Sequence, residues 1–215
     1  MKKDFKLILF PILAVLIFGG IIFFMNKSKE ETKDVQPVAT APSQLMRDSA
    51  YVKGDANAPV TIVEFFDPEC EGCGAFHPLL KRIMDEYEGK VKLVARYMLF
   101  HGNSLHAAFA LEGAGAQGKY YDLFNILLER QNEWGHQEPG SVNHIFEKYA
   151  KEIGLNVETF KTAFNNPEYA AIFEKDIADG KSLGVRGTPT FFINGKMLQR
   201  LSYQDLRNAI DAELK

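Results

Sequence analysis

The chain of 215 residues is long enough for one ordinary domain with an appended segment, and too short for two full domains. Its composition, with 46% hydrophobic and 25% charged residues, is that of a globular protein rather than a disordered one. The formal net charge of −3 gives no sign of the strongly basic face that nucleic-acid-binding proteins carry, so no nucleic-acid partner is expected.

The N-terminal residues 1–26 differ from the rest of the chain. Leu7 to Met25 is a continuous run of apolar, glycine and proline residues, preceded by Lys2, Lys3 and Lys6. At about 1.5 Å per residue this run nearly spans a hydrocarbon core of about 30 Å. We therefore expect a single-pass transmembrane helix, with a cleaved signal peptide as the alternative. The lysines favour a cytoplasmic N-terminus, with the remainder of the chain facing the periplasm or the cell exterior.

Residues 27–50 are predicted to be a flexible linker. Most residues of this segment are polar. The segment contains Pro37 and Pro42 and shows no sustained hydrophobic periodicity. It is too short to hold a dimerisation domain, so a monomer is expected. A single α/β domain is predicted over residues 51–215.

Two strands and a helix are predicted at the start of this domain. Val60 to Phe66 (VTIVEFF) is β-branched and aromatic on both faces, which is typical of a central strand. A helix follows, in which apolar residues recur at helical spacing from Phe76 to Tyr87, before Gly89. Val91 to Phe100 is a second predicted strand, which a βαβ crossover makes parallel to the first.

A helical block and a hairpin complete the predicted domain. No strand pattern occurs between about residues 101 and 183, so a helical insertion is expected there. Its predicted helices are roughly Ser104–Ala116, Lys119–Gln131, Ser141–Ile153 and Pro167–Leu183. Two short strands, Thr190–Ile193 and Lys196–Leu201, are joined by an Asn194-Gly195 turn and followed by a helix over Gln204–Leu214.

Cys70 and Cys73 are the only cysteines in the sequence, and they stand where the first predicted strand leads into a helix. Amides in the first turn of a helix carry partial positive charge and stabilise a thiolate, which favours Cys70 as the nucleophile. Cys73, one turn later, is placed to resolve a mixed disulfide. The pair predicts thiol–disulfide exchange without a cofactor.

The cysteine pair has two alternative interpretations. His77 lies one turn beyond Cys73, so Cys70, Cys73 and His77 are three possible metal ligands. A fourth ligand is not evident and His77 is expected at the helix surface, so no metal is predicted. An inert structural disulfide is the second alternative, but a pair this close closes too short a loop to stabilise the fold much.

Glu64 is an acidic residue within the otherwise apolar first strand. A buried carboxyl group is costly unless it is paired or neutral, so its presence in a core strand indicates a function. We expect burial to raise its pKa, so that Glu64 exchanges a proton with Cys73. The alternative is that strand twist exposes it at a sheet edge. His106, Trp134 and His136 are expected to be packing or surface residues.

These residues resemble the thioredoxin superfamily, and most closely its DsbA-like branch. The segment from Glu64 to Cys73 (EFFDPECEGC) is similar to the family's strand, acidic residue and active site. Pro78 is similar to the proline of the active-site helix, and Gly187 to Phe192 (GTPTFF) to the cis-proline segment. The resemblance implies a thioredoxin fold with a helical insertion, a cis bond at Pro189, and a substrate peptide that pairs with the backbone of Thr188.

The resemblance also implies a function at the bacterial cytoplasmic membrane. It points to an anchored oxidoreductase that introduces disulfides into exported proteins and is reoxidised by a quinone-linked membrane partner. A reductase or isomerase of the same fold is the alternative, followed by a non-catalytic metal- or peptide-binding module. Glu69 and Glu71 flank Cys70. The dipeptide between the two cysteines, Glu71-Gly72, lacks the histidine of the strongly oxidising type. The charge of Glu69 and Glu71 is expected to raise the pKa of Cys70 relative to a histidine-containing site, which would make the disulfide a weaker oxidant.

Overall fold

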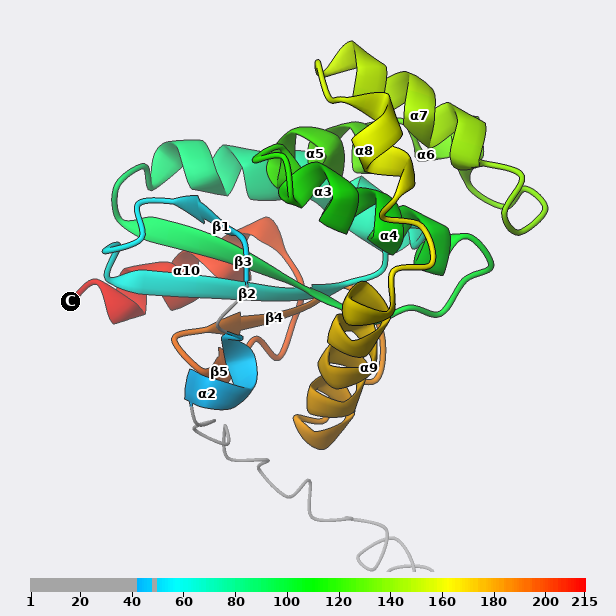
Figure 1. Cartoon of the computed structure of the whole chain (residues 1–215). Coiled ribbons are helices and arrows are strands. Elements are labelled where there is room, and N and C mark those ends of the chain that lie inside the picture. Colours follow the sequence, from blue (N-terminus) through cyan, green and yellow to red (C-terminus); the bar gives the residue numbers. More distant parts are fainter. Residues whose placement is uncertain (1–41, 48–49) are drawn as a thin grey trace, which may run out of the picture. The chain divides into compact units, whose positions relative to one another are not determined.

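A computed structural model describes residues 42–47 and 50–215. Within these residues a five-stranded sheet has the order β1-β3-β2-β4-β5 (Figure 1). The strands are β1 Val52–Gly54, β2 Val60–Phe66, β3 Val91–Tyr97, β4 Thr190–Ile193 and β5 Lys196–Met197. β2 and β3 are parallel, as predicted, and the remaining pairs are antiparallel. The apolar sequence of β2 follows from its position between β3 and β4.

Along the chain, helices precede the first strand, connect the strands and follow the last strand. α3, Glu71–Glu86, connects β2 to β3 and begins directly after Cys70. Between β3 and β4 lie α4 Ser104–Gly115, α5 Tyr120–Glu129, α6 Gln131–Trp134, α7 Asn143–Glu152, α8 Val157–Lys161 and α9 Pro167–Ser182. α2, Pro42–Leu45, precedes the sheet and α10, Tyr203–Glu213, follows it.

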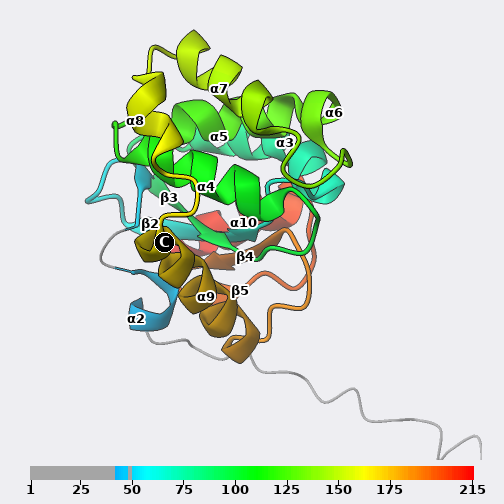
Figure 2. The same ribbon diagram turned by 45° about the vertical axis from the view of Figure 1, so that its right-hand side comes forward.

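Both faces of the sheet are covered by helices. α3 and α10 pack on the face to which Ile62 contributes. α2 and the end of α9 cover the opposite face, to which Val63 and Phe65 contribute. Figure 2 shows the insertion helices α4, α5 and α7 on the same side as α3, with α9 on the other. Because strand side chains alternate between faces, Glu64 shares with Ile62 the face toward α3.

Most predicted elements are confirmed, and the differences lie at strand ends. β3 ends at Tyr97 rather than Phe100, whose backbone N–H instead donates to the side chain of Asp67 at 2.6 Å. β5 ends at Met197 rather than Leu201, because the chain bends to reach Ser202, whose side chain caps α10. β1, α6 and α8 were not predicted, since such short elements carry little periodicity.

The predicted membrane helix, residues 1–26, lies outside the described residues, as do residues 27–41 and 48–49 of the predicted linker. In the part of the chain that the structure describes, no helix is both long and apolar enough to cross a membrane. Residues 42–47 pack as part of the domain, because α2 forms there and both Leu45 and Arg47 are buried. The prediction that residues 42–47 belong to a flexible linker is therefore wrong.

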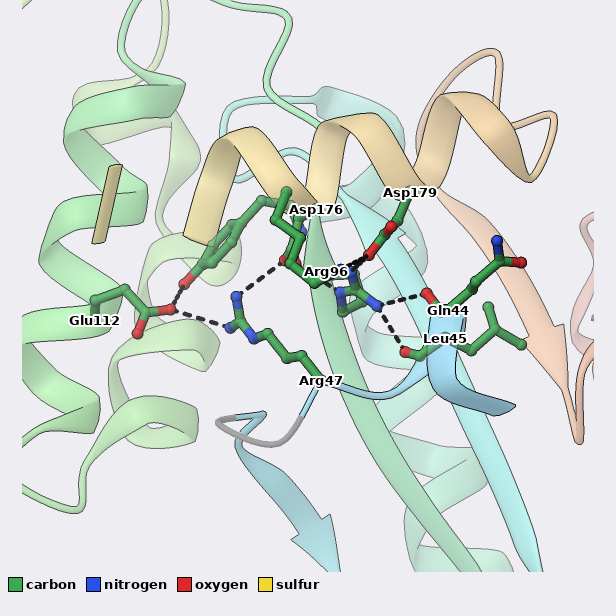
Figure 3. Close-up of polar contacts among 9 residues, drawn as sticks. Gln44, Leu45, Arg47, Arg96, Glu112, Asp176 and Asp179 are labelled. Carbon is green, nitrogen blue, oxygen red and sulfur yellow. Dashed lines mark hydrogen bonds and ion pairs between the residues drawn. The ribbon is translucent and has the colours of Figure 1, made fainter. Parts of the chain in front are cut away.

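The carboxyl end of α2 is held by Arg96 of β3 (Figure 3). Nη1 of Arg96 donates to the backbone carbonyls of Gln44 and Leu45 at 3.0 and 2.9 Å. Its Nε donates to Asp176 Oδ1 and its Nη2 to Asp179 Oδ2, both at 2.7 Å. Because the guanidinium is completely buried, these four acceptors replace the water that it loses.

Arg47 extends the network to the helical insertion (Figure 3). It lies 3.2 Å from Glu112 Oε1 of α4 and 3.2 Å from Asp176 Oδ2 of α9. Glu112 also accepts a hydrogen bond from the hydroxyl of Tyr97 at 2.8 Å. Four segments distant in the sequence, α2 with its following residues, β3, α4 and α9, are thereby fixed to one another.

Asp176→Ala is expected to destabilise the domain by about 3–5 kcal/mol, because it removes one of the two carboxylates that pair with the buried Arg96 and also a partner of the buried Arg47. Urea unfolding of the full chain measures the loss. Lys175→Ala is the matched control, since Lys175 is exposed and pairs only with Asp179; its effect is expected to stay below about 1 kcal/mol. Equal effects of the two substitutions would contradict the role given to the network.

Candidate active site

Cys70 occupies the N-cap position of α3, and Cys73 lies in the first turn of that helix. The N–H groups of Cys73 and Gly74 both donate to the carbonyl of Cys70, at 3.0 and 3.1 Å, which starts the helix at this point. Both cysteines are free thiols; Cys73 is buried and Cys70 is partly exposed. Cys70 is thus the more accessible of the two sulfurs.

Several groups stabilise a thiolate at Cys70. The largest contribution is the hydrogen bond from the Cys73 thiol. Partial burial acts in the opposite direction. Smaller stabilising contributions come from the side chain of Thr188 and from the backbone N–H groups of Cys73 and Gly72. Together they lower the pKa of Cys70 to about 5. At neutral pH Cys70 is therefore a thiolate, which is both a nucleophile and a good leaving group.

Glu64 and Cys73 are buried beside this thiolate, with exposed fractions of 2% and 0%. Burial, and after it the charge of Cys70, raises the pKa of Glu64 to about 8. Burial also raises the pKa of Cys73, with further contributions from Cys70 and from the charge of Glu64. The predicted burial of Glu64 is confirmed, and exposure at a sheet edge is excluded because β2 is central. A protonated Glu64 is therefore available to a Cys73 thiolate.

The loop that precedes β4 closes the site from the other side. The Thr188–Pro189 peptide bond is cis, as predicted. The carbonyl oxygen of Thr188 lies 3.4 Å from the sulfur of Cys70. A Cβ added at Gly72 would lie 3.4 Å from Cδ of Pro189, so the dipeptide and the loop are in close contact. An open groove continues from this loop, lined by Arg186, Gly187, Thr188, Pro189, Met197 and Leu201.

Gln131, at the start of α6 in the insertion, supports the active-site backbone. Its Nε2 donates to the carbonyls of Pro68 and Cys70 at 2.7 and 2.9 Å. A Cβ added at Gly74 would lie 2.2 Å from Oε1 of Gln131, so a larger residue at this position would displace the Gln131 side chain. Gln131 was not predicted, because its partners are backbone carbonyls more than 60 residues away, and no local pattern marks such a contact.

Asp67, directly after β2, is a second support that was not predicted. Its fully buried carboxylate accepts from the backbone N–H groups of Glu69 and Phe100 at 2.9 and 2.6 Å. It also accepts from the hydroxyl of Ser104 and lies 2.8 Å from Nδ1 of His101. Although burial opposes it, the contact with Asp67 raises the pKa of His101. The loop before α4 is thereby fixed against the active site.

The charges of Glu69 and Glu71 are engaged by the insertion. The buried carboxylate of Glu69 accepts from the backbone N–H groups of Asn103 and His136, at 2.6 and 2.7 Å. Oε1 of Glu71 lies 2.7 Å from the ring Nε2 of His136. Hydrogen bonds to the sulfur lower the pKa of Cys70 despite these two neighbouring carboxylates. That the two carboxylates raise this pKa relative to a histidine-containing site stays a prediction.

His77 is buried, which corrects the expected surface position. Helix α5 covers this side of α3, and Phe124 packs against the imidazole with ring centroids 5.5 Å apart. Burial lowers the pKa of His77 to about 4. Among the described residues no group of three or more His, Cys, Asp or Glu side chains is arranged to hold a metal ion. Trp134 is a packing residue, as expected, and His136 is exposed at the surface.

Comparison with known proteins adds three relationships. Residues 47–212 match the thioredoxin family. Disulfide bond formation protein D of Bacillus subtilis is 29% identical over 175 residues, which cover 76% of this chain and 77% of that protein. The crystal structure of oxidised BdbD from Bacillus subtilis superimposes with a TM-score of 0.72 at 27% identity, covering 83% of this chain and 98% of that one.

The chain is also similar to part of a group of larger proteins. Na(+)/H(+) antiporter NhaA 3 of Salinispora tropica is 31% identical over 152 residues, or 69% of this chain. The chain spans only 22% of the length of that antiporter. The similarity is therefore to one portion of the antiporter, and the transport activity in its name is not transferred.

Cys73→Ala is expected to raise the pKa of Cys70, because it removes the thiol that contributes most to stabilising the thiolate. The rate of alkylation of the reduced protein, followed against pH, measures this value. The wild type is expected to reach half its maximal rate near pH 5. Cys70→Ala is the control, because the remaining buried Cys73 should stay unreactive throughout. An unchanged profile in Cys73→Ala would exclude the hydrogen bond.

Glu64→Gln is expected to become more stable relative to wild type as the pH rises. A glutamate that ionises near pH 4.5 when unfolded and near 8 when folded binds more protons in the folded state between these values. The free energy of unfolding of the wild type therefore falls as the pH rises across this window, whereas that of the variant does not. Relative to wild type, the variant is stabilised by about 3–4 kcal/mol between pH 4.5 and pH 8.

Urea unfolding of both reduced proteins at pH 4.5 and pH 8 tests this expectation. Glu88→Gln, which alters an exposed glutamate just beyond α3, is the matched control. A stability difference between Glu64→Gln and wild type that does not change with pH would show that Glu64 is not held neutral.

Proposed function

This chain belongs to the thioredoxin family and is a DsbA-like thiol–disulfide oxidoreductase, and from that premise we propose that it is an oxidase that introduces disulfides into exported proteins. The observation that carries the proposal is the set of hydrogen bonds to the sulfur of Cys70. A stabilised thiolate favours the reduced enzyme, which makes the Cys70–Cys73 disulfide a strong oxidant. A reductase needs the opposite balance and is the alternative.

The proposed reaction moves two electrons from a substrate dithiol to the enzyme. A substrate thiolate attacks Sγ of Cys70, a mixed disulfide forms, and the bond between Cys70 and Cys73 breaks. The second substrate thiolate then attacks the substrate sulfur of the mixed disulfide. The substrate disulfide forms and Cys70 leaves as a thiolate, for which its low pKa makes it well suited.

Glu64 is proposed to supply the proton in the first step. Cys73 leaves as a thiolate in a buried position, where burial and the neighbouring charges raise its pKa. Glu64 is equally buried, and with a pKa of about 8 it carries a proton at neutral pH. Transfer of this proton gives a neutral Cys73 thiol, which then donates its hydrogen bond to Cys70.

The substrate is proposed to lie against the cis-proline loop. Thr188 and Pro189 border both the partly exposed Cys70 and the open groove. An extended peptide at this loop pairs with the backbone of Thr188 and brings its cysteine to Sγ of Cys70. Because backbone contacts carry no sequence preference, such a site accepts many unfolded chains.

The proposal includes a location and a recycling partner. Residues 1–26 anchor the protein in the bacterial cytoplasmic membrane, residues 27–41 follow as a linker, and the domain faces the periplasm or the cell exterior as a monomer. Disulfides persist in that compartment. Continued turnover needs a partner that takes two electrons from the reduced pair, and a quinone-linked membrane oxidase meets this requirement without a cofactor in the chain.

The redox equilibrium of the full chain with glutathione, in detergent, tests the direction of the reaction. Alkylation of Cys70 and Cys73 followed by mass measurement gives the reduced fraction in each buffer. We expect a potential more positive than about −200 mV, against about −270 mV for thioredoxin. A value near that of thioredoxin would make the protein a reductase. Cys70→Ser, which has no exchangeable pair, is the control for non-specific alkylation.

A further inference from the structure

His136, in the loop after α6, contacts the residues on both sides of Cys70. Its backbone N–H donates to Oε1 of Glu69 at 2.7 Å, and its ring Nε2 lies 2.7 Å from Oε1 of Glu71. Glu69 directly precedes the nucleophile and Glu71 directly follows it. One residue of the helical insertion therefore holds both acidic neighbours of Cys70.

The backbone of His136 adopts an unusual conformation that serves these two contacts. Its φ of +58° lies in the left-handed region, which residues with a side chain seldom occupy. Such a conformation persists where the surrounding contacts hold it. The preceding Gly135 bonds the carbonyl of Gln131 at 2.6 Å, and a Cβ there would lie 2.9 Å from the same oxygen. This tight turn directs the N–H of His136 to Glu69.

The titratable groups around the imidazole of His136 come from two parts of the fold. Glu69 and Glu71 belong to the active-site segment. His101 belongs to the loop before α4, and the centroid of its ring lies 6.3 Å from the ring centroid of His136. Glu69 is already satisfied by two backbone N–H groups. Glu71 is mostly exposed, and its pKa is lowered by its own backbone N–H and then by His136 and His101.

We propose that His136 is a positioning residue that pairs with Glu71, orients Glu69, and so stabilises the Cys70 thiolate and strengthens the oxidant. The proposal rests on the proposed function only in that Cys70 is the exchanging sulfur. Without a positive imidazole, the charge of Glu71 acts one residue from Cys70, and like charge disfavours a thiolate.

His136→Asn in the full chain tests the proposal, because asparagine tolerates the left-handed backbone but has no charge. We expect the pKa of Cys70 to rise by about half a unit, and the equilibrium constant for oxidation of glutathione at pH 6 to fall about threefold. His144→Asn is the matched control, because His144 is an exposed histidine of α7 that contacts only the carbonyl of Ser141; it is expected to change neither value.

Two further variants separate charge from structure. In a Glu71→Gln background, His136→Asn is expected to have no effect, because the carboxylate that it compensates is gone. His136→Lys, which restores a positive charge, is expected to recover the wild-type equilibrium at pH 6. Far-ultraviolet circular dichroism confirms that each variant is folded.

Equal values for wild type and His136→Asn at pH 6 would overturn the proposal. A full effect in the Glu71→Gln background would also overturn it, because the role of His136 would then be structural. The oxidase assignment fails in a different way: the wild-type potential would lie near that of thioredoxin, while the shift in His136→Asn would still be measured.

Discussion

Hydrogen bonds to the sulfur of Cys70 require distant segments of the chain to meet at one point. The start of α3 supplies the Cys73 thiol and the N–H groups, and the loop before β4 supplies the side chain of Thr188. The sheet makes this possible, because β2, which leads to Cys70, pairs directly with β4, which follows Thr188 and Pro189. The central position of β2 is thus a condition for the chemistry as well as for the core.

The same arrangement puts a carboxyl group where a stable fold would place an apolar side chain. Glu64 lies on the face of β2 that α3 covers, and among the described residues its Oε2 has no hydrogen-bond partner. Burial holds the carboxyl neutral at the cost of stability above its ordinary pKa. The proposed proton transfer to Cys73 explains why this cost is tolerated, since active sites are where local structure departs from what stability favours.

The helical insertion acts on the active site through backbone and charge more than through apolar packing. Gln131 holds the carbonyls of Pro68 and Cys70, while Asn103 and His136 hold Glu69. The insertion is itself fixed to the sheet by the Arg47 and Arg96 network. A rigid mount of this kind lets residues far from Cys70 in sequence set the stability of its thiolate.

The cis bond at Pro189 was implied by the resemblance to the thioredoxin superfamily. The sequence by itself determined β2, α3, the cysteine pair and the buried Glu64, together with the helical block. Each follows from local periodicity, a short motif, or a residue type that only one environment tolerates. The contacts of Gln131 and His136, the burial of His77 and the docking of Arg47 were decided by tertiary structure. The charges of Glu69 and Glu71 illustrate the difference, because their proximity to Cys70 is visible in sequence but their partners are not. Those partners lie more than 30 residues away, and no local pattern encodes which groups the folded chain brings together.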